Sequence, residues 1–131
     1  MLLCKPDSYT DIMLVTKEFT FDSAHFLPNY HGKCENMHGH TYRLQVTVDG
    51  PVDKNGLVID FVLLKKVVKE RVLEKLDHKI INDVIKVASA ENMVIWIWNQ
   101  LANLPEFSNE IRMHEVKLWE TPNSFVTYYG K

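Results

Sequence analysis

The chain has 131 residues, of which 46% are hydrophobic and 24% are charged, and its formal net charge is -2. This length and composition predict one globular domain over residues 1–131, with a short N-terminal extension over residues 1–11. A slightly negative charge argues against a general attraction to nucleic acid or to anionic membranes. The apolar runs are far shorter than the roughly 20 residues that a membrane-spanning helix needs.

The two cysteines, Cys4 and Cys34, lie too far apart in the chain and are too few to form a disulfide framework. The N-terminus shows no signal-peptide pattern. We therefore expect a cytoplasmic protein in which Cys34 is a free thiol, and we expect no role for Cys4.

Two segments in the first half of the chain alternate between apolar and polar residues. Residues 12–25 and 42–49 accordingly predict two strands, separated by a loop over residues 28–37. The Asp-Gly-Pro sequence at 49–51 and the Asn-Gly sequence at 55–56 are typical of turns.

The second half of the chain predicts two helices followed by two strands. Asp60 is a suitable N-cap for a helix over residues 61–76, and Ser89 for a helix that ends near residue 103, before Pro105. A loop over residues 77–83 separates them. Residues 111–120 and 124–130 predict strands joined by a turn at 121–123. The order strand-strand-helix-helix-strand-strand indicates an α+β fold.

Three histidines are candidate metal ligands. His38 and His40 are two residues apart, so on a strand their side chains would point to the same face, and His25 ends the first predicted strand. Three imidazoles without a fourth protein ligand form the open type of zinc site that catalysis needs. Cys34 with two of the histidines is an alternative ligand set, and each histidine could also be an ordinary solvated side chain.

Cys34 and Glu35 precede the two closely spaced histidines. Cys34 could be an inert thiol, a fourth metal ligand or a catalytic base. Glu35 could be a solvated loop carboxylate or a second acid-base group, because a carboxylate near a metal can move protons.

Two further places carry possible chemistry. Asp77 and His78 could simply end the first helix, or the carboxylate could orient the imidazole for proton transfer. Glu120 could be an edge-strand charge, or it could accept two hydrogen bonds from an amino-substituted heterocycle. Trp96 and Trp98 fit packing better than a stacking platform for bases.

Six segments of the chain form an ordered set of motifs. They are Phe-Asp-Ser-Ala-His at 21–25, Cys-x3-His-Gly-His at 34–40, Gly-Leu-Val-Ile-Asp-Phe at 56–61, Leu-Asp-His at 76–78, Ser-Ala-Glu-Asn at 89–92 with Trp-Ile-Trp at 96–98, and Trp-Glu-Thr at 119–121. In this order they resemble the 6-pyruvoyl-tetrahydropterin synthase family. The resemblance is strongest to its bacterial branch, the 6-carboxy-5,6,7,8-tetrahydropterin synthases of queuosine biosynthesis, and it covers about residues 13–130.

The resemblance implies the tunnelling fold (T-fold), a four-stranded antiparallel sheet with two helices packed on one face. Family members commonly assemble as a homohexamer of two trimers with active sites between subunits. The resemblance also implies that His25, His38 and His40 bind one Zn²⁺ per subunit. It implies a small-molecule pterin triphosphate as the partner, and neither nucleic acid nor membrane.

The implied substrate is 7,8-dihydroneopterin triphosphate, which this branch converts to 6-carboxy-5,6,7,8-tetrahydropterin with release of acetaldehyde and triphosphate. Cys34 would be the general base, Asp77 and His78 would form a proton relay, and Glu120 would anchor the pterin ring. We also expect Thr121 and Ser89 to contact the substrate. Lys33 is a candidate for holding the triphosphate.

Two features of the motif around Cys34 bear on the product. Three residues separate Cys34 from His38, as in the carboxy branch, whereas the 6-pyruvoyl enzymes of animals have a longer insertion. Glu35 stands where a third branch uses a glutamate to release 6-hydroxymethyl-7,8-dihydropterin for folate synthesis, so a bifunctional enzyme is an alternative. A non-catalytic zinc protein or pterin-binding module would instead need Cys34 to close the zinc shell.

Overall fold

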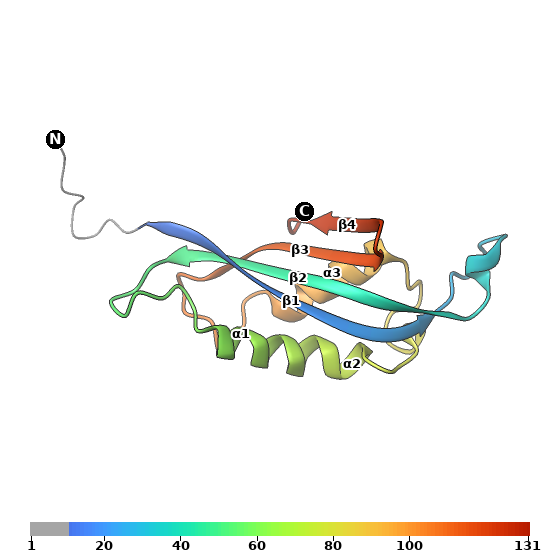
Figure 1. Cartoon of the computed structure of the whole chain (residues 1–131), viewed down its shortest axis with the longest axis horizontal. Coiled ribbons are helices and arrows are strands. Elements are labelled where there is room, and N and C mark those ends of the chain that lie inside the picture. The colour runs from blue at the N-terminus through green and yellow to red at the C-terminus, as the bar shows by residue number, and fades with distance from the viewer. Residues whose placement is uncertain (1–10) are drawn as a thin grey trace.

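A computed structural model describes residues 11–131 and shows a four-stranded antiparallel sheet with strand order β1-β2-β3-β4 (Figure 1). The expected extension, with Cys4, lies outside the described residues except for its last residue. The predicted order of strands and helices is confirmed. The strands are β1 (Ile12–His25), β2 (His38–Pro51), β3 (Arg112–Thr121) and β4 (Ser124–Tyr128).

Both predicted helices begin at the expected caps. The Asp60 carboxylate accepts from Val62 N at 2.8 Å, and Ser89 Oγ accepts from Asn92 N at 3.1 Å. The first helix contains one wide π-helical turn, and the second ends two residues earlier than predicted. The helical segments are α1 (Phe61–Val68), the π turn η2 (Lys69–Leu73), α2 (Glu74–Leu76) and α3 (Ala90–Leu101), with short 3-10 turns η1 (Lys33–Glu35) and η3 (Ile81–Asp83).

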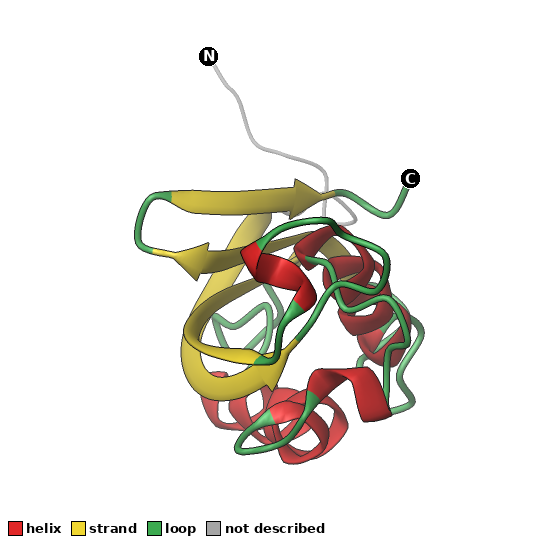
Figure 2. Cartoon of the chain, turned by 90° about the vertical axis from the view of Figure 1, so that its right-hand side faces the viewer, coloured by secondary structure: helices red, strands yellow, loops and turns green. Residues whose placement is uncertain are grey.

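The helices cover one face of the sheet, and the core lies between the two layers (Figure 2). Alternate residues of β2 enter this core because side chains alternate across a strand. The helices contribute residues at helical spacing. The buried core includes Leu44, Val46 and Val48 of β2, Leu64, Val67, Val68, Val72 and Leu76 of the first helix, and Met93, Ile97 and Leu101 of α3.

The second strand is longer at both ends than the sequence pattern predicts. The turn predicted at residues 49–51 is wrong, because Gly50 pairs with Met13 inside the sheet. A Cβ at Gly50 would lie 3.1 Å from Val58 Cγ1, so this glycine fits close packing rather than a turn. The turn at 55–56 is confirmed, with Gly56 at a φ of +83°. At its other end β2 begins at His38, because the long partner β1 pairs with it as far as His25.

No helix within residues 11–131 is both long enough and apolar enough to cross a membrane.

Candidate active site

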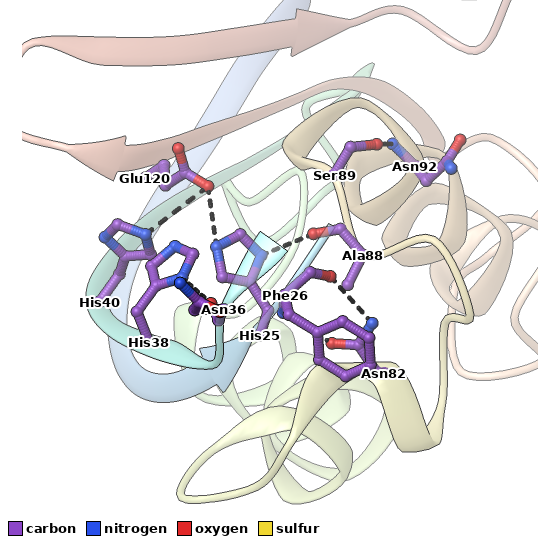
Figure 3. Close-up of polar contacts among 10 residues, drawn as sticks. All are labelled: His25, Phe26, Asn36, His38, His40, Asn82, Ala88, Ser89, Asn92 and Glu120. Carbon is purple, nitrogen blue, oxygen red and sulfur yellow. Dashed lines mark hydrogen bonds and ion pairs between the residues drawn. The ribbon is translucent and has the colours of Figure 1, made fainter. Parts of the chain in front are cut away.

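Strand register brings the three candidate metal ligands together at one end of the sheet (Figure 3). His25 pairs with His38, and Ser23 pairs with His40, so all three imidazoles lie on the face that the helices cover. Their ring centroids are 4.6 to 5.1 Å apart. The cluster therefore continues the row of buried side chains that forms the core.

Backbone carbonyl groups orient two of the imidazoles. His25 Nδ1 lies 2.7 Å from the Ala88 carbonyl oxygen, and His38 Nδ1 lies 2.7 Å from the Asn36 carbonyl oxygen (Figure 3). A carbonyl oxygen can only accept a hydrogen bond, so each Nδ1 must carry the proton. In the neutral ring this leaves the Nε2 lone pair free, which is the arrangement that metal-binding histidines adopt.

The cluster fits a metal ion. One nitrogen of each ring lies within 4.8 Å of the other two. The Nε2 atoms of His25 and His40 are buried and make no hydrogen bond within residues 11–131. Burial lowers the pKa of His40; the Glu120 carboxylate opposes this shift, and the neighbouring His25 and His38 add to it. A metal requires the neutral ring, and burial favours that form.

Glu120 lies at the metal cluster itself. Its Oε1 is 3.2 Å from His25 Nε2 and 3.8 Å from His40 Nε2. Tyr42 lies behind the same two imidazoles, with ring centroids 6.0 Å from His25 and 5.6 Å from His40. Burial raises the pKa of Tyr42, and the charge of Glu120 raises it further. The carboxylate for which the family resemblance implies contact with the pterin ring is thus also a neighbour of the candidate metal ligands.

Cys34 and Glu35 lie in η1, in the connection between β1 and β2. Cys34 is half-buried and Glu35 is exposed. Within residues 11–131, two groups of three potential ligands are close enough to share an ion, and neither contains Cys34 or Glu35. This geometry favours three imidazoles over a ligand set that includes the thiol.

Asp77 and His78 belong to the second of these groups, together with Asp22. Asp77 Oδ1 lies 2.9 Å from His78 Nδ1 and accepts a hydrogen bond from Asp22 N at 3.0 Å. His78 N donates to the Asp22 carbonyl oxygen at 2.6 Å, with His78 held at a φ of +58°. These bonds attach the pair to the outer edge of β1.

Two hollows adjoin His40. One of about 550 Å³ includes His78 and Lys79 in its lining, and the other of about 490 Å³ includes Glu120 and Thr121. Two candidate substrate contacts remain. Ser89 follows Ala88 in the chain and caps α3, and Lys33 is exposed in η1.

Sequence reasoning missed several residues that shape this end of the molecule. The carbonyl groups of Ala88 and Asn36 have no sequence signature. Asn82 binds the backbone of Phe26 twice, next to His25: its Oδ1 accepts from Phe26 N and its Nδ2 donates to Phe26 O, both at 3.0 Å (Figure 3). An asparagine in a loop was the available signal for this contact.

Arg43 was also missed. It lines the second hollow, and its guanidinium carbon lies 3.9 Å from the centre of the Trp119 ring. The other two arginines of the chain, Arg71 and Arg112, pair with carboxylates, whereas Arg43 has no ion-pair partner in the described part of the chain. Its charge is therefore available to an anion.

Residues 14–131 match the family model described as 6-pyruvoyl tetrahydropterin synthase. The chain belongs to this family. It is 35% identical to a 6-carboxy-5,6,7,8-tetrahydropterin synthase from Haemophilus influenzae, over 87% of this chain and 96% of that protein. It is 38% identical to a 6-pyruvoyl tetrahydrobiopterin synthase from Dictyostelium discoideum, over 91% of this chain and 97% of that protein.

The fold agrees with this family membership. The solved structure of 6-pyruvoyl tetrahydropterin synthase from Caenorhabditis elegans superposes with a TM-score of 0.79 and 27% identity, covering 93% of this chain and 98% of that one. The predicted T-fold subunit, with two helices on one face of a four-stranded antiparallel sheet, is therefore confirmed. As a member of the 6-pyruvoyl tetrahydropterin synthase family, the protein is a pterin-processing enzyme.

Proposed function

We propose that this enzyme is zinc-dependent and converts 7,8-dihydroneopterin triphosphate to 6-carboxy-5,6,7,8-tetrahydropterin, with release of acetaldehyde and triphosphate, in queuosine biosynthesis. The observation that carries the proposal is the cluster of three imidazoles without a thiol among the ligands, in which the buried Nε2 atoms of His25 and His40 make no hydrogen bond within residues 11–131. His25, His38 and His40 would hold the ion, which supplies Lewis acidity toward the hydroxyl groups of the substrate side chain. The Haemophilus relative supports the choice of product.

Cys34 is the proposed general base that takes a proton from the substrate side chain. It is half-buried in η1, close in sequence to His38, and outside the group of ligands. A thiolate beside positive charge is a suitable base at neutral pH. Glu35, the next residue, is exposed and is the proposed base for the alternative reaction discussed below.

Asp77 and His78 are the proposed relay for the second proton. The carboxylate 2.9 Å from His78 Nδ1 would keep the proton on that nitrogen and leave Nε2 to exchange a proton with the substrate. Asp22 and Thr41, which lie beside the relay, are directed to the opposite face of the sheet from His40. We therefore propose that the relay serves the metal centre of a neighbouring subunit, in a hexamer of two trimers.

The substrate would lie in the hollows that adjoin His40. Glu120 is the proposed anchor for the pterin ring, with Thr121 beside it in the same hollow. Ser89 is a proposed substrate contact, because it directly follows Ala88, whose carbonyl group orients His25. Lys33 and Arg43 are the proposed contacts of the triphosphate. Arg43 is the better supported, because it lines a hollow and lacks a carboxylate partner within residues 11–131.

Side-chain cleavage to 6-hydroxymethyl-7,8-dihydropterin is the second candidate function. It is favoured by the presence of Glu35 directly after Cys34 in one short turn. Formation of 6-pyruvoyl-tetrahydropterin is a third candidate, supported by the similarity to the 6-pyruvoyl tetrahydrobiopterin synthase of Dictyostelium. A non-catalytic zinc protein is disfavoured, because it would need Cys34 among the ligands.

Product analysis tests the proposal. Zinc-loaded protein is incubated with 7,8-dihydroneopterin triphosphate, and pterins and aldehydes are identified by mass spectrometry. We expect 6-carboxytetrahydropterin and acetaldehyde from the wild type, and a loss of at least about 100-fold in Cys34→Ala with zinc retained. Glu35→Ala should keep this product, as should the control Glu110→Ala at another exposed carboxylate. Hydroxymethyl-dihydropterin as the sole product, lost in Glu35→Ala, would replace the proposal with the folate reaction.

A further inference from the structure

The buried polar atoms without partners are concentrated in one place. Within residues 11–131, three buried side-chain polar atoms make no hydrogen bond, and they are His25 Nε2, His40 Nε2 and Tyr42 Oη. The Tyr42 ring contacts the rings of both histidines edge to face. Two of the three atoms, His25 Nε2 and His40 Nε2, are proposed metal ligands. The Tyr42 hydroxyl therefore lies on a ring that contacts the proposed metal centre.

A phenylalanine would fill the position of Tyr42 without burying a hydroxyl group that lacks a hydrogen-bond partner. The ring is fully buried and stacks on Phe21, with centroids 5.0 Å apart and an interplanar angle of 11°. The hydroxyl adds nothing to that stack, and a buried hydroxyl without a partner destabilises the fold because it has lost its hydrogen bonds to water. Buried tyrosines normally direct their hydroxyl to a partner. A partner is therefore expected in the state in which the site functions.

Strand register places a carboxylate near this hydroxyl. The β2–β3 ladder ends with Arg43 opposite Trp119, so Tyr42 and Glu120 are the next residues along the two strands. Both lie at the imidazole cluster, where Glu120 Oε1 contacts the Nε2 atoms of His25 and His40. Within residues 11–131 these Nε2 atoms donate no hydrogen bond to the carboxylate, so Glu120 can accept one from a nearby hydroxyl.

We propose that the Tyr42 hydroxyl is a positioning group that donates a hydrogen bond to the Glu120 carboxylate when a metal occupies the three imidazoles. The inference rests on the proposed metal centre and adds to it a residue outside the ligand set. Groups that orient a metal site in this way typically change metal affinity by about 10- to 100-fold when they are removed.

The test compares Tyr42→Phe with the wild type in two measurements that need no substrate. The dissociation constant of zinc, measured by competition with a chromophoric chelator, should rise about tenfold. Thermal unfolding of the metal-free protein should be unchanged or shifted upward, because the variant keeps the ring stack and removes an unpaired hydroxyl. Tyr128→Phe is the matched control, since its ring packs on Trp98 at the far edge of the sheet, and it should leave zinc affinity unchanged.

A double-mutant cycle assigns the effect to Glu120. In a Glu120→Ala background, Tyr42→Phe should cause no further loss of zinc affinity. Equal zinc affinity of Tyr42→Phe and wild type would overturn the inference while leaving the metal centre intact, and so would a full additional loss in the Glu120→Ala background. If the wild type bound no zinc, the metal centre would fail together with the inference. The product analysis stays a separate result in every case.

Discussion

His40 and Thr41 are adjacent in β2, yet their side chains belong to clusters on opposite faces of the sheet. His40 lies with the other two imidazoles on the face covered by the helices. Thr41 Oγ1 donates to the Asp22 carboxylate at 2.5 Å, and Asp22 is grouped with the proposed relay of Asp77 and His78. Side-chain alternation thus directs Asp22 and Thr41 away from the imidazoles of their own chain.

Mixed oligomers test whether subunits share active sites. His38→Ala should inactivate the metal centre, and His78→Ala should inactivate the relay. If each active site combines the metal centre of one subunit with the relay of another, equimolar mixed oligomers should recover about a quarter of wild-type activity, because one site in four has both parts intact. The measurement is turnover after coexpression of the two variants. No recovery would place both parts in one chain.

Metal removal should destabilise the protein. Zinc at about 1,000 times its dissociation constant should add about 4 kcal/mol to the free energy of unfolding, because the ion binds the assembled imidazoles and not the unfolded chain. Thermal unfolding with zinc and with a chelator measures this difference. His38→Ala should abolish it, whereas His114→Ala, a histidine on β3 near Asp49, should retain it. A zinc response that survives His38→Ala would contradict the proposed ligand set.

Asn82→Ala should destabilise the end of the sheet next to His25. The amide makes three hydrogen bonds at 3.0 Å, two with the backbone of Phe26 and one with the Lys86 carbonyl oxygen. Their loss should lower the free energy of unfolding by about 2–4 kcal/mol, measured by urea titration. Asn99→Ala, on the exposed side of α3, is the control and should change it by less than about 0.5 kcal/mol. Equal stability of the two variants would show that the Asn82 contacts contribute nothing.

Arg43→Gln should weaken binding of the triphosphate part of the substrate. An arginine can bind phosphate oxygens with two parallel hydrogen bonds, which glutamine cannot replace. We expect KM to rise about tenfold with little change in kcat, since a charged hydrogen bond is worth roughly 1.5–3 kcal/mol. Arg112→Gln removes the same charge from a residue already paired with Asp49 and serves as the control. Equal KM values for the two variants would exclude Arg43 as a phosphate contact.

Local patterns determined most of the secondary structure. Alternation predicted the strands, helical spacing predicted the buried stripes, and the side chains of Asp60 and Ser89 marked where the helices begin. The pattern failed at Gly50, because glycine next to proline resembles a turn. In the fold, close packing against Val58 and pairing with Met13 keep Gly50 in the strand.

The sequence alone also identified His25, His38 and His40 as candidate ligands, because residue type and spacing are visible in the chain. Only the tertiary structure placed Glu120 and Tyr42 at the imidazoles and brought the Ala88 carbonyl to His25. Backbone carbonyls have no side-chain signature, and contacts between distant strands depend on the register of the sheet. Register follows from the packing of the whole core, which no local segment encodes.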